Sequence, residues 1–231
     1  MYERVLAFMG GVPELIVMLT RDDHTVENAY EIFTQCRNTG VQFWGMKEKG
    51  LPLKQMKELY AYMKDCGKTT VLEVAAYTDK ECIEGAQIAV ECKCDFLMGT
   101  MFMQSVNELC KENNLKYMPF IGNIEGRPSI LSGSIEGMIE EAENCLEQGV
   151  YGFDLLGYRY RADAVALNNR FVSQVRAPVC IAGSIDSPQK LAEVKHASPW
   201  AFTIGSAFFA NAFGGTIGEQ IEKVRRLVAN A

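Results

Sequence analysis

The sequence predicts an α/β protein, a single (β/α)8 or TIM barrel, from three observations. Short apolar runs alternate with amphipathic segments along the 231 residues, which is the pattern of parallel strands joined by helices. There are eight apolar runs of this kind, and eight is the number of strands that closes into a barrel. The length suits one such barrel, so one domain is expected over residues 1–231.

The expected strands are Leu15–Thr20, Val41–Lys47, Thr70–Ala76, Phe96–Met101, Tyr117–Ile121, Gly152–Leu156, Pro178–Ala182 and Ala201–Gly205. Helices fit between them with recognisable starts. Thr78 and Glu81 have the spacing of a capping box, and Ser187 precedes a proline at a first helical position. An open, doubly wound sheet is the alternative fold. It would carry a glycine-rich phosphate loop after its first strand, where residues 20–24 contain no glycine.

Composition and charge exclude several classes of protein. Hydrophobic residues make up 48% and charged residues 23% of the chain, which is ordinary for a globular protein. The net charge of -6 would repel a nucleic-acid backbone. No apolar run reaches the roughly 18 residues of a membrane span, and Met1–Gly10 lacks the features of a signal peptide. We therefore expect a cytoplasmic protein with no nucleic-acid or membrane partner, and leave a homo-oligomer open.

The ends of the seventh and eighth expected strands share a Gly-Ser pair, Gly183-Ser184 and Gly205-Ser206. Glycine lets a backbone N–H approach an anion closely, and serine adds a hydroxyl donor. Neighbouring parallel strands end at the same face of a barrel. The two pairs therefore predict a cup for phosphate.

With these paired tips the chain resembles the ribulose-phosphate-binding (β/α)8 barrels, the phosphate-binding TIM barrels, most strongly over residues 152–209. That superfamily includes isomerases, pentulose-phosphate epimerases and sugar-phosphate decarboxylases. The resemblance implies that both Gly-Ser pairs hold the phosphate of a small phosphorylated metabolite. The chain has Ala182 where most of these families have a first glycine. It also lacks the decarboxylases' Asp-x-Lys-x-x-Asp pattern and the epimerases' metal-binding histidines, which weakens those two activities.

Three ionisable residues in expected strands are candidate catalytic groups: Lys47, Glu73 and Asp154. A carboxylate inside an apolar strand is costly unless it is paired or hydrogen-bonded. Lys47 ends the strand next to that of Glu73 and is the expected partner. Side-chain alternation places Gly45 on the same face as Lys47, where its small size would leave space for a ligand. The set would serve proton transfer beside a carbonyl or, through Lys47, a Schiff base. Both mechanisms stay open.

Polar residues in the expected loops are candidate substrate ligands: Arg21, Asp22, Arg127 and Arg159. Arg127 falls in a long Gly- and Pro-containing segment, residues 122–133, which is expected to be a lid or substrate loop. A metal on Asp22, Asp23 and His24 would need further ligands that the sequence does not place. We expect neither a resident metal nor a cofactor.

The function predicted from the sequence is that of an enzyme acting on a small phosphorylated carbonyl compound. The reaction would be that of an isomerase or epimerase, or of a carbon-carbon lyase. The alternative is a sensor of a phosphorylated ligand, because the order of the last two strand tips is similar to that of the glycerol uptake antiterminator barrels. The interior ionisable residues favour the enzyme.

Overall fold

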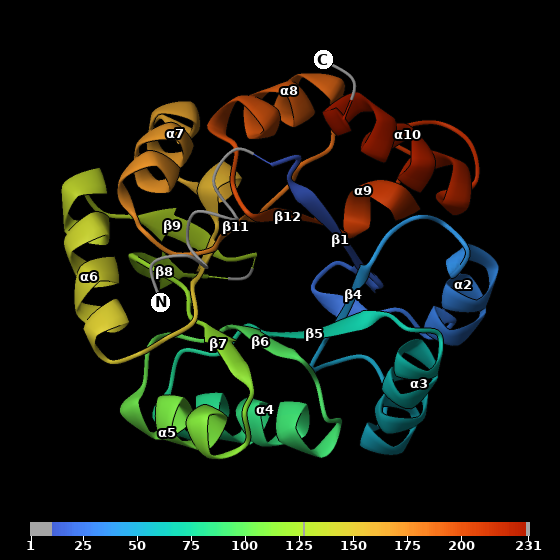
Figure 1. Ribbon diagram of the computed structural model, residues 1–231, viewed down its shortest axis with the longest axis horizontal. Coiled ribbons are helices and arrows are strands. Elements are labelled where there is room, and N and C mark those ends of the chain that lie inside the picture. The colour runs from blue at the N-terminus through green and yellow to red at the C-terminus, as the bar shows by residue number, and fades with distance from the viewer. Residues whose placement is uncertain (1–10, 127, 230–231) are drawn as a thin grey trace.

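A computed structural model describes residues 11–126 and 128–229 as a ring of parallel strands inside a ring of helices (Figure 1). The strands of the ring are β1 (Glu14–Met18), β4 (Phe43–Lys47), β5 (Thr69–Val74), β6 (Phe96–Gly99), β7 (Lys116–Met118), β10 (Phe153–Leu155), β11 (Val179–Ile181) and β12 (Ala201–Ile204). They form one eight-stranded sheet in the order β10-β11-β12-β1-β4-β5-β6-β7. The prediction of a (β/α)8 barrel is confirmed.

The ring closes between β7 and β10 by a sparser set of contacts than the other ladders. Phe120 and Asp154 form an isolated parallel bridge. The backbone N–H of Asp154 donates to the carbonyl of Pro119 at 3.0 Å, and that of Tyr151 donates to Tyr117 at 2.9 Å. We call this junction the β7–β10 seam.

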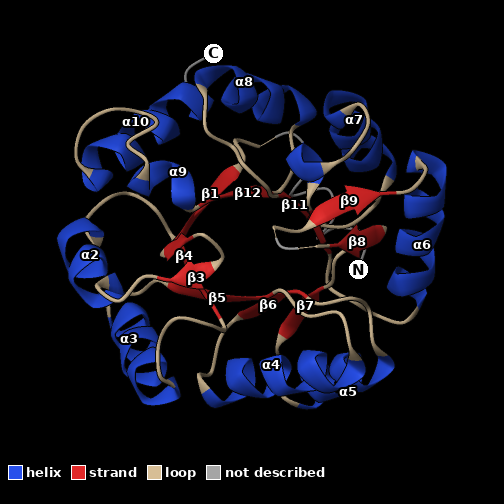
Figure 2. Ribbon diagram, turned by 180° about the vertical axis from the view of Figure 1, so that it is seen from behind, coloured by secondary structure: helices blue, strands red, loops and turns tan. Residues whose placement is uncertain are grey.

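The outer layer consists of helices that follow the strands in turn and surround them on all sides (Figure 2). They are α2 (Ala29–Cys36), α3 (Leu53–Asp65), α4 (Asp79–Glu91), α5 (Gln104–Glu112), α6 (Ile135–Glu147), α7 (Ala164–Gln174), α8 (Pro188–Ala197), α9 (Ser206–Phe209) and α10 (Ile217–Ala229), with a 3-10 turn at Gly157–Arg159. Both expected helix starts are confirmed. The Thr78 side chain accepts from the N–H of Glu81, and the Ser187 side chain accepts from the N–H of Lys190. No helix within the described residues is both long and apolar enough to cross a membrane.

The barrel interior is apolar at the end where the strands begin. Phe43, Phe96, Tyr151 and Trp200 pack against one another there, with ring centroids as close as 5.2 Å. Methionine and valine side chains continue this core upward. Lys116 at the start of β7 places its ammonium over the Phe96 and Tyr151 rings. The buried ion pair of Lys47 and Glu73 lies at the other end, where β4 and β5 finish. Gly45 does not leave a space there, because a Cβ atom at this position would lie 2.4 Å from the sulfur of Met18. The expectation of a ligand space above Gly45 was wrong.

Two segments differ from the expected loops. The first strand ends at Met18, and the chain then forms a small hairpin of β2 (Thr20–Arg21) and β3 (His24–Thr25). Residues 122–133 contain a second hairpin, β8 (Asn123–Glu125) and β9 (Ile130–Ser132). A lid or substrate loop was expected there, and the hairpin within it was not predicted. The side-chain alternation of such short strands was masked by the glycines and proline around them.

Candidate active site

A pocket of about 500 Å³ opens at the carboxyl ends of the barrel strands. It is lined by side chains from the first strand and its hairpin, from β4 and β5, and from the tips of β11 and β12. Eight of the residues expected at the site line it together: Asp22, Lys47, Glu73, Arg159, Gly183, Ser184, Gly205 and Ser206. This volume suits a small metabolite.

Lys47 and Glu73 are direct neighbours across the β4–β5 ladder. The ammonium nitrogen of Lys47 lies 3.1 Å from a carboxylate oxygen of Glu73. Both side chains are about nine-tenths buried, with 8% and 10% of their surfaces exposed. The pairing expected from strand alternation is therefore present, at the wall of the pocket.

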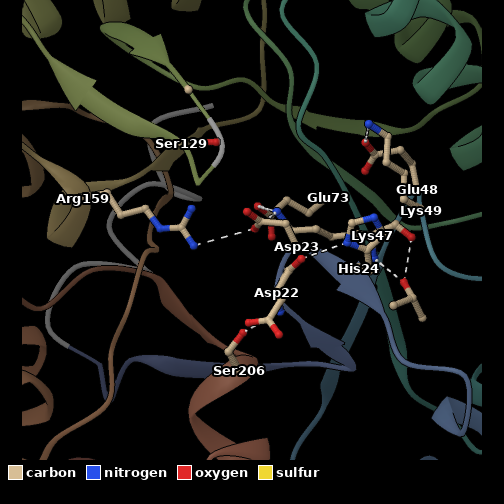
Figure 3. Close-up of polar contacts among 12 residues, drawn as sticks. Asp22, Asp23, His24, Lys47, Glu48, Lys49, Glu73, Ser129, Arg159 and Ser206 are labelled. Carbon is tan, nitrogen blue, oxygen red and sulfur yellow. Dashed lines mark hydrogen bonds and ion pairs between the residues drawn. The ribbon is translucent and has the colours of Figure 1, made fainter.

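Asp23 is a second carboxylate partner of Lys47, and the sequence interpretation did not place it at the site except as a metal candidate. Its Oδ1 atom accepts from Lys47 Nζ at 2.9 Å (Figure 3). Burial alone would lower the pKa of Lys47, but the charges of Glu73 and Asp23 outweigh burial and hold that pKa above its ordinary value. Lys47 is consequently an ammonium ion at neutral pH.

The turn of the β2–β3 hairpin decides which aspartate reaches Lys47. Asp22 and Asp23 have positive φ angles of 51° and 61°, as in the tight hairpin turns that favour Asn, Asp and Gly. The hydroxyl of Thr25 donates to the carbonyl of Lys47 at 2.8 Å and accepts from the backbone N–H of Lys47 at 2.9 Å. These bonds fasten the hairpin beside β4. Asp22 points the other way, with 85% of its side chain exposed.

Asp154 faces the barrel interior next to Cys180 of β11, as alternation predicted. It is fully buried, and neither carboxylate oxygen has a hydrogen-bond partner among the described residues. Burial, followed by the charge of Glu73, raises the pKa of Asp154 well above its ordinary value, against the opposing effect of Lys47. The barrel interior therefore favours the protonated form of this carboxyl group more than water does.

Arg159 lies at the end of the 3-10 turn that follows β10 and reaches across the pocket toward Asp23 (Figure 3). Its guanidinium is 3.8 Å from Asp23 Oδ1. Its side chain also packs on the β11 tip, because a Cβ atom at Gly183 would lie 2.8 Å from Arg159 Cγ. Gly183 is thus needed for packing as well as for its positive φ of 93°.

The two Gly-Ser strand tips border the same pocket, as the sequence predicted. Ser184 has a positive φ of 54°, and both serines are exposed. A Cβ atom at Gly205 would meet the hydroxyl of Thr20 at 2.5 Å, so the β12 tip packs closely on the first hairpin. The tips are placed to receive an anion, and their phosphate role remains a prediction.

One of the expected substrate ligands within the described residues does not join the pocket. Arg21 lies on the outer side of its hairpin, with 65% of its side chain exposed and a contact to Asp22 at 3.5 Å. It points away because alternation in the short strand β2 turns it from the neighbouring Thr20, which lines the pocket. Arg127 lies outside the described residues. Over residues 11–126 and 128–229, no three His, Cys, Asp or Glu side chains are grouped as a metal site.

Several pocket residues were missed by sequence reasoning. Thr20 and Thr203 contribute hydroxyl groups, and Pro128 of the β8–β9 hairpin borders the opening. The adjacent Ser129 shares a hydrogen bond of 2.5 Å with the hydroxyl of Tyr77, which follows β5. Alternation from Ala201 would have placed Thr203 inward. The Tyr77 contact joins residues 52 positions apart and has no sequence signal.

Comparison with solved structures gives the same fold. Orotidine 5'-phosphate decarboxylase from Pyrococcus horikoshii aligns with a TM-score of 0.68 and 11% identity over 94% of this chain and 100% of that chain. N-acetylmannosamine-6-phosphate 2-epimerase from Clostridium perfringens aligns at 0.63 and 14% identity over 95% and 93%. A glycerol uptake operon antiterminator regulatory protein from Listeria monocytogenes aligns at 0.58 and 12% identity over 85% and 94%. Neither family models nor curated protein sequences give a match.

These likenesses establish the (β/α)8 barrel fold, which the sequence predicted. The proteins named differ in activity, and one of them is a regulator. At 11–14% identity the fold alone is transferable. Function must be argued from the pocket.

Proposed function

We propose that this chain is an enzyme that acts on a small phosphorylated carbonyl compound, as an isomerase or epimerase or as a carbon-carbon lyase. One observation carries the proposal. A single pocket of about 500 Å³ contains both a buried ammonium-carboxylate cluster and two exposed Gly-Ser strand tips. The first can move a proton, and the second can hold a phosphate.

In this proposal the substrate phosphate accepts hydrogen bonds from the backbone and hydroxyl groups at Ser184 and Ser206. The carbonyl end then points toward Lys47 and Glu73 on the other side of the pocket. Arg159, which lines the pocket and pairs with Asp23 at 3.8 Å, would meet a further oxygen of the substrate.

The ionic cluster supports proton transfer with electrostatic stabilisation. The Glu73 carboxylate accepts the proton from the carbon beside the carbonyl, and the electron pair moves onto the carbonyl oxygen. The Lys47 ammonium stabilises that oxyanion in a site with little water. Returning the proton to the other carbon or face gives isomerisation or epimerisation. In a lyase, the same oxyanion forms when a carbon-carbon bond breaks.

The raised pKa of Lys47 weighs against the Schiff-base alternative. A Schiff base requires the neutral amine as nucleophile, and enzymes that use one lower the lysine pKa by burial or by neighbouring cations. Here the neighbours are the carboxylates of Asp23 and Glu73, at 2.9 Å and 3.1 Å.

A ligand sensor remains the second candidate, because the antiterminator from Listeria monocytogenes has the same fold. A sensor needs the phosphate tips but has no use for a buried acid-base cluster. The cluster therefore favours the enzyme.

The first prediction tests both halves of this proposal. Inorganic phosphate should raise the melting temperature, since a ligand of the folded state stabilises it by about 2.7 kcal/mol at a hundred times its Kd. A panel of sugar phosphates and phosphorylated oxo acids in D2O should then reveal deuterium uptake beside the carbonyl by NMR. Glu73→Gln and Lys47→Met should abolish that uptake. Lys54→Met is the control, because 88% of that side chain is exposed on α3.

Each outcome has a distinct meaning. Stabilisation without deuterium uptake or cleavage of any panel compound would favour the sensor. Full deuterium uptake by the Lys47→Met protein would remove Lys47 from the mechanism. An increase in the mass of a Lys47-containing peptide after treatment with substrate and borohydride would support the Schiff base instead. No stabilisation by phosphate or any phosphorylated compound would refute the phosphate cup.

A further inference from the structure

We propose that Ser206 is a positioning residue that couples anion binding at the β12 tip to the charge pair of Lys47 and Asp23. The ligand-bound half of this inference rests on the phosphate role proposed above. The ligand-free half rests only on the contacts of the β2–β3 hairpin.

A short chain of contacts joins the two ends of the pocket. The backbone N–H of Asp22 donates to the hydroxyl oxygen of Ser206 at 3.2 Å, although the two residues are 184 positions apart. The next residue, Asp23, accepts from the Lys47 ammonium at 2.9 Å. One turn therefore touches the β12 tip with one residue and the ionic cluster with the following one (Figure 3).

The hairpin that carries this turn is stiff. Its two central residues, Asp22 and Asp23, both hold positive φ angles, and the ring of His24 is 2.9 Å from the carbonyl of Asp22. On one side Thr25 is bonded twice to the Lys47 backbone. These contacts provide a direct route by which a movement at the Ser206 end reaches the Asp23 carboxylate.

The chemistry of the serine hydroxyl explains how an anion would act. The Ser206 oxygen accepts from the N–H of Asp22, and its own proton is available for donation. A phosphate oxygen that accepts this proton polarises the hydroxyl and strengthens its bond to Asp22, because chained hydrogen bonds reinforce one another. Bound phosphate then fixes the turn, and the turn fixes Asp23 against Lys47.

Ser184 provides a matched control on the neighbouring strand tip. It lines the same pocket and is exposed like Ser206. Its contact, however, runs toward α8, where its carbonyl accepts from Lys190 at 2.7 Å. Removing the Ser184 hydroxyl should weaken an anion site while leaving the first hairpin unchanged.

The second prediction concerns the Lys47 ammonium in the free protein. Its NMR signal in ¹⁵N-lysine protein is identified by its loss in Lys47→Met or, if that variant does not fold, in Lys47→Arg. Ser206→Ala should speed hydrogen exchange of this ammonium about fivefold, the factor expected for one ordinary hydrogen bond. Ser206→Thr should restore the slow exchange, and Ser184→Ala should leave it unchanged.

The same exchange measurement is repeated with inorganic phosphate as the ligand. Saturating phosphate should slow Lys47 exchange in the wild type and in Ser184→Ala, and have no effect in Ser206→Ala. Equal exchange rates in free Ser206→Ala and wild type would overturn the coupling, whatever phosphate does. A clear Ser206→Ala effect in the free protein, with no phosphate response in the wild type, would instead refute the phosphate site and leave the coupling intact.

Discussion

Lys47 keeps its charge inside the barrel because two carboxylates lie within hydrogen-bonding distance of its ammonium group. Taking an ion out of water costs several kcal/mol, and neither Lys47 nor Glu73 could be buried alone at that cost. Each of the two residues therefore needs the other in order to remain charged in the barrel. This residue-scale dependence can be measured without knowing the substrate.

The third prediction is a strong energetic coupling between Lys47 and Glu73. Lys47→Met should lower the free energy of unfolding by about 3–5 kcal/mol, because it leaves a buried carboxylate unpaired. The same change made in a Glu73→Gln protein should cost about 1–3 kcal/mol less. Urea unfolding of the four proteins gives both values.

The exposed pair Lys80 and Glu84 on α4 is the control for this cycle. Its atoms are 3.9 Å apart, with 83% and 58% of the side chains exposed, so its coupling should be small. Equal coupling in the two cycles would show that Lys47 and Glu73 are not held together by burial.

The sequence predicted the direction of individual side chains correctly where the alternation of side chains along a strand alone determines it. Lys47, Glu73 and Asp154 point inward because the side-chain period of a strand is two. The contact of Asp23 with Lys47 was not predicted, because it depends on two positive φ angles in a turn. Alternation carries no information about such a turn, and a shift of one residue there reverses the direction of the side chain.

At the scale of elements, the two added hairpins shape the opening of the pocket. The β8–β9 hairpin is anchored on one side by Tyr160, whose hydroxyl donates to the carbonyl of Gly133 at 2.7 Å. On the other side its tip contacts Tyr77 through Ser129. The helices and the barrel strands could be predicted from the spacing of apolar residues and from helix caps. The two hairpins could not be predicted in this way, because long-range side-chain contacts such as Tyr77 to Ser129 stabilise them.

The fourth prediction is that the Tyr77 hydroxyl holds the β8–β9 hairpin in place. In Tyr77→Phe, the amides of Glu125 and Ile130, which are paired across the hairpin, should exchange about fivefold faster, because one hydrogen bond is lost from a small unit that opens locally. Hydrogen-exchange NMR measures this. Tyr30→Phe on α2 is the matched control, since Tyr30 is half exposed and remote from the hairpin in sequence. Unchanged exchange in Tyr77→Phe would show that the Tyr77 hydroxyl does not hold the hairpin.

At the scale of the whole molecule, the barrel strands pair through ladders of two to five positions, except at the sparser β7–β10 seam. The β4–β5 ladder has five paired positions, whereas the seam is one isolated bridge with bonds from Tyr151 and Asp154. Pro119 accepts there but has no N–H to donate. Strand count predicted the closed barrel. Which junction would be sparse could not be predicted, since strand pairing in register depends on all eight strands together.

The last prediction is that the seam opens before the rest of the barrel, and more readily as pH rises. The Asp154 carboxyl is buried at the seam, and its pKa is raised well above the ordinary value of about 3.9. Opening exposes it to water and returns the pKa toward that value, so the proton is released on opening. The closed seam is therefore most stable below about pH 4 and loses up to about 1.4 kcal/mol per pH unit above it, until the raised pKa is reached.

After correction for intrinsic exchange, protection of the Tyr151 amide should fall with pH, whereas that of Val71 in the β4–β5 ladder should not. Asp154→Asn should remove the pH dependence, while Asp65→Asn on the exposed face of α3 should retain it. A seam whose protection is independent of pH in the wild type would mean that Asp154 is already ionised inside the closed barrel, with Lys47 compensating its charge.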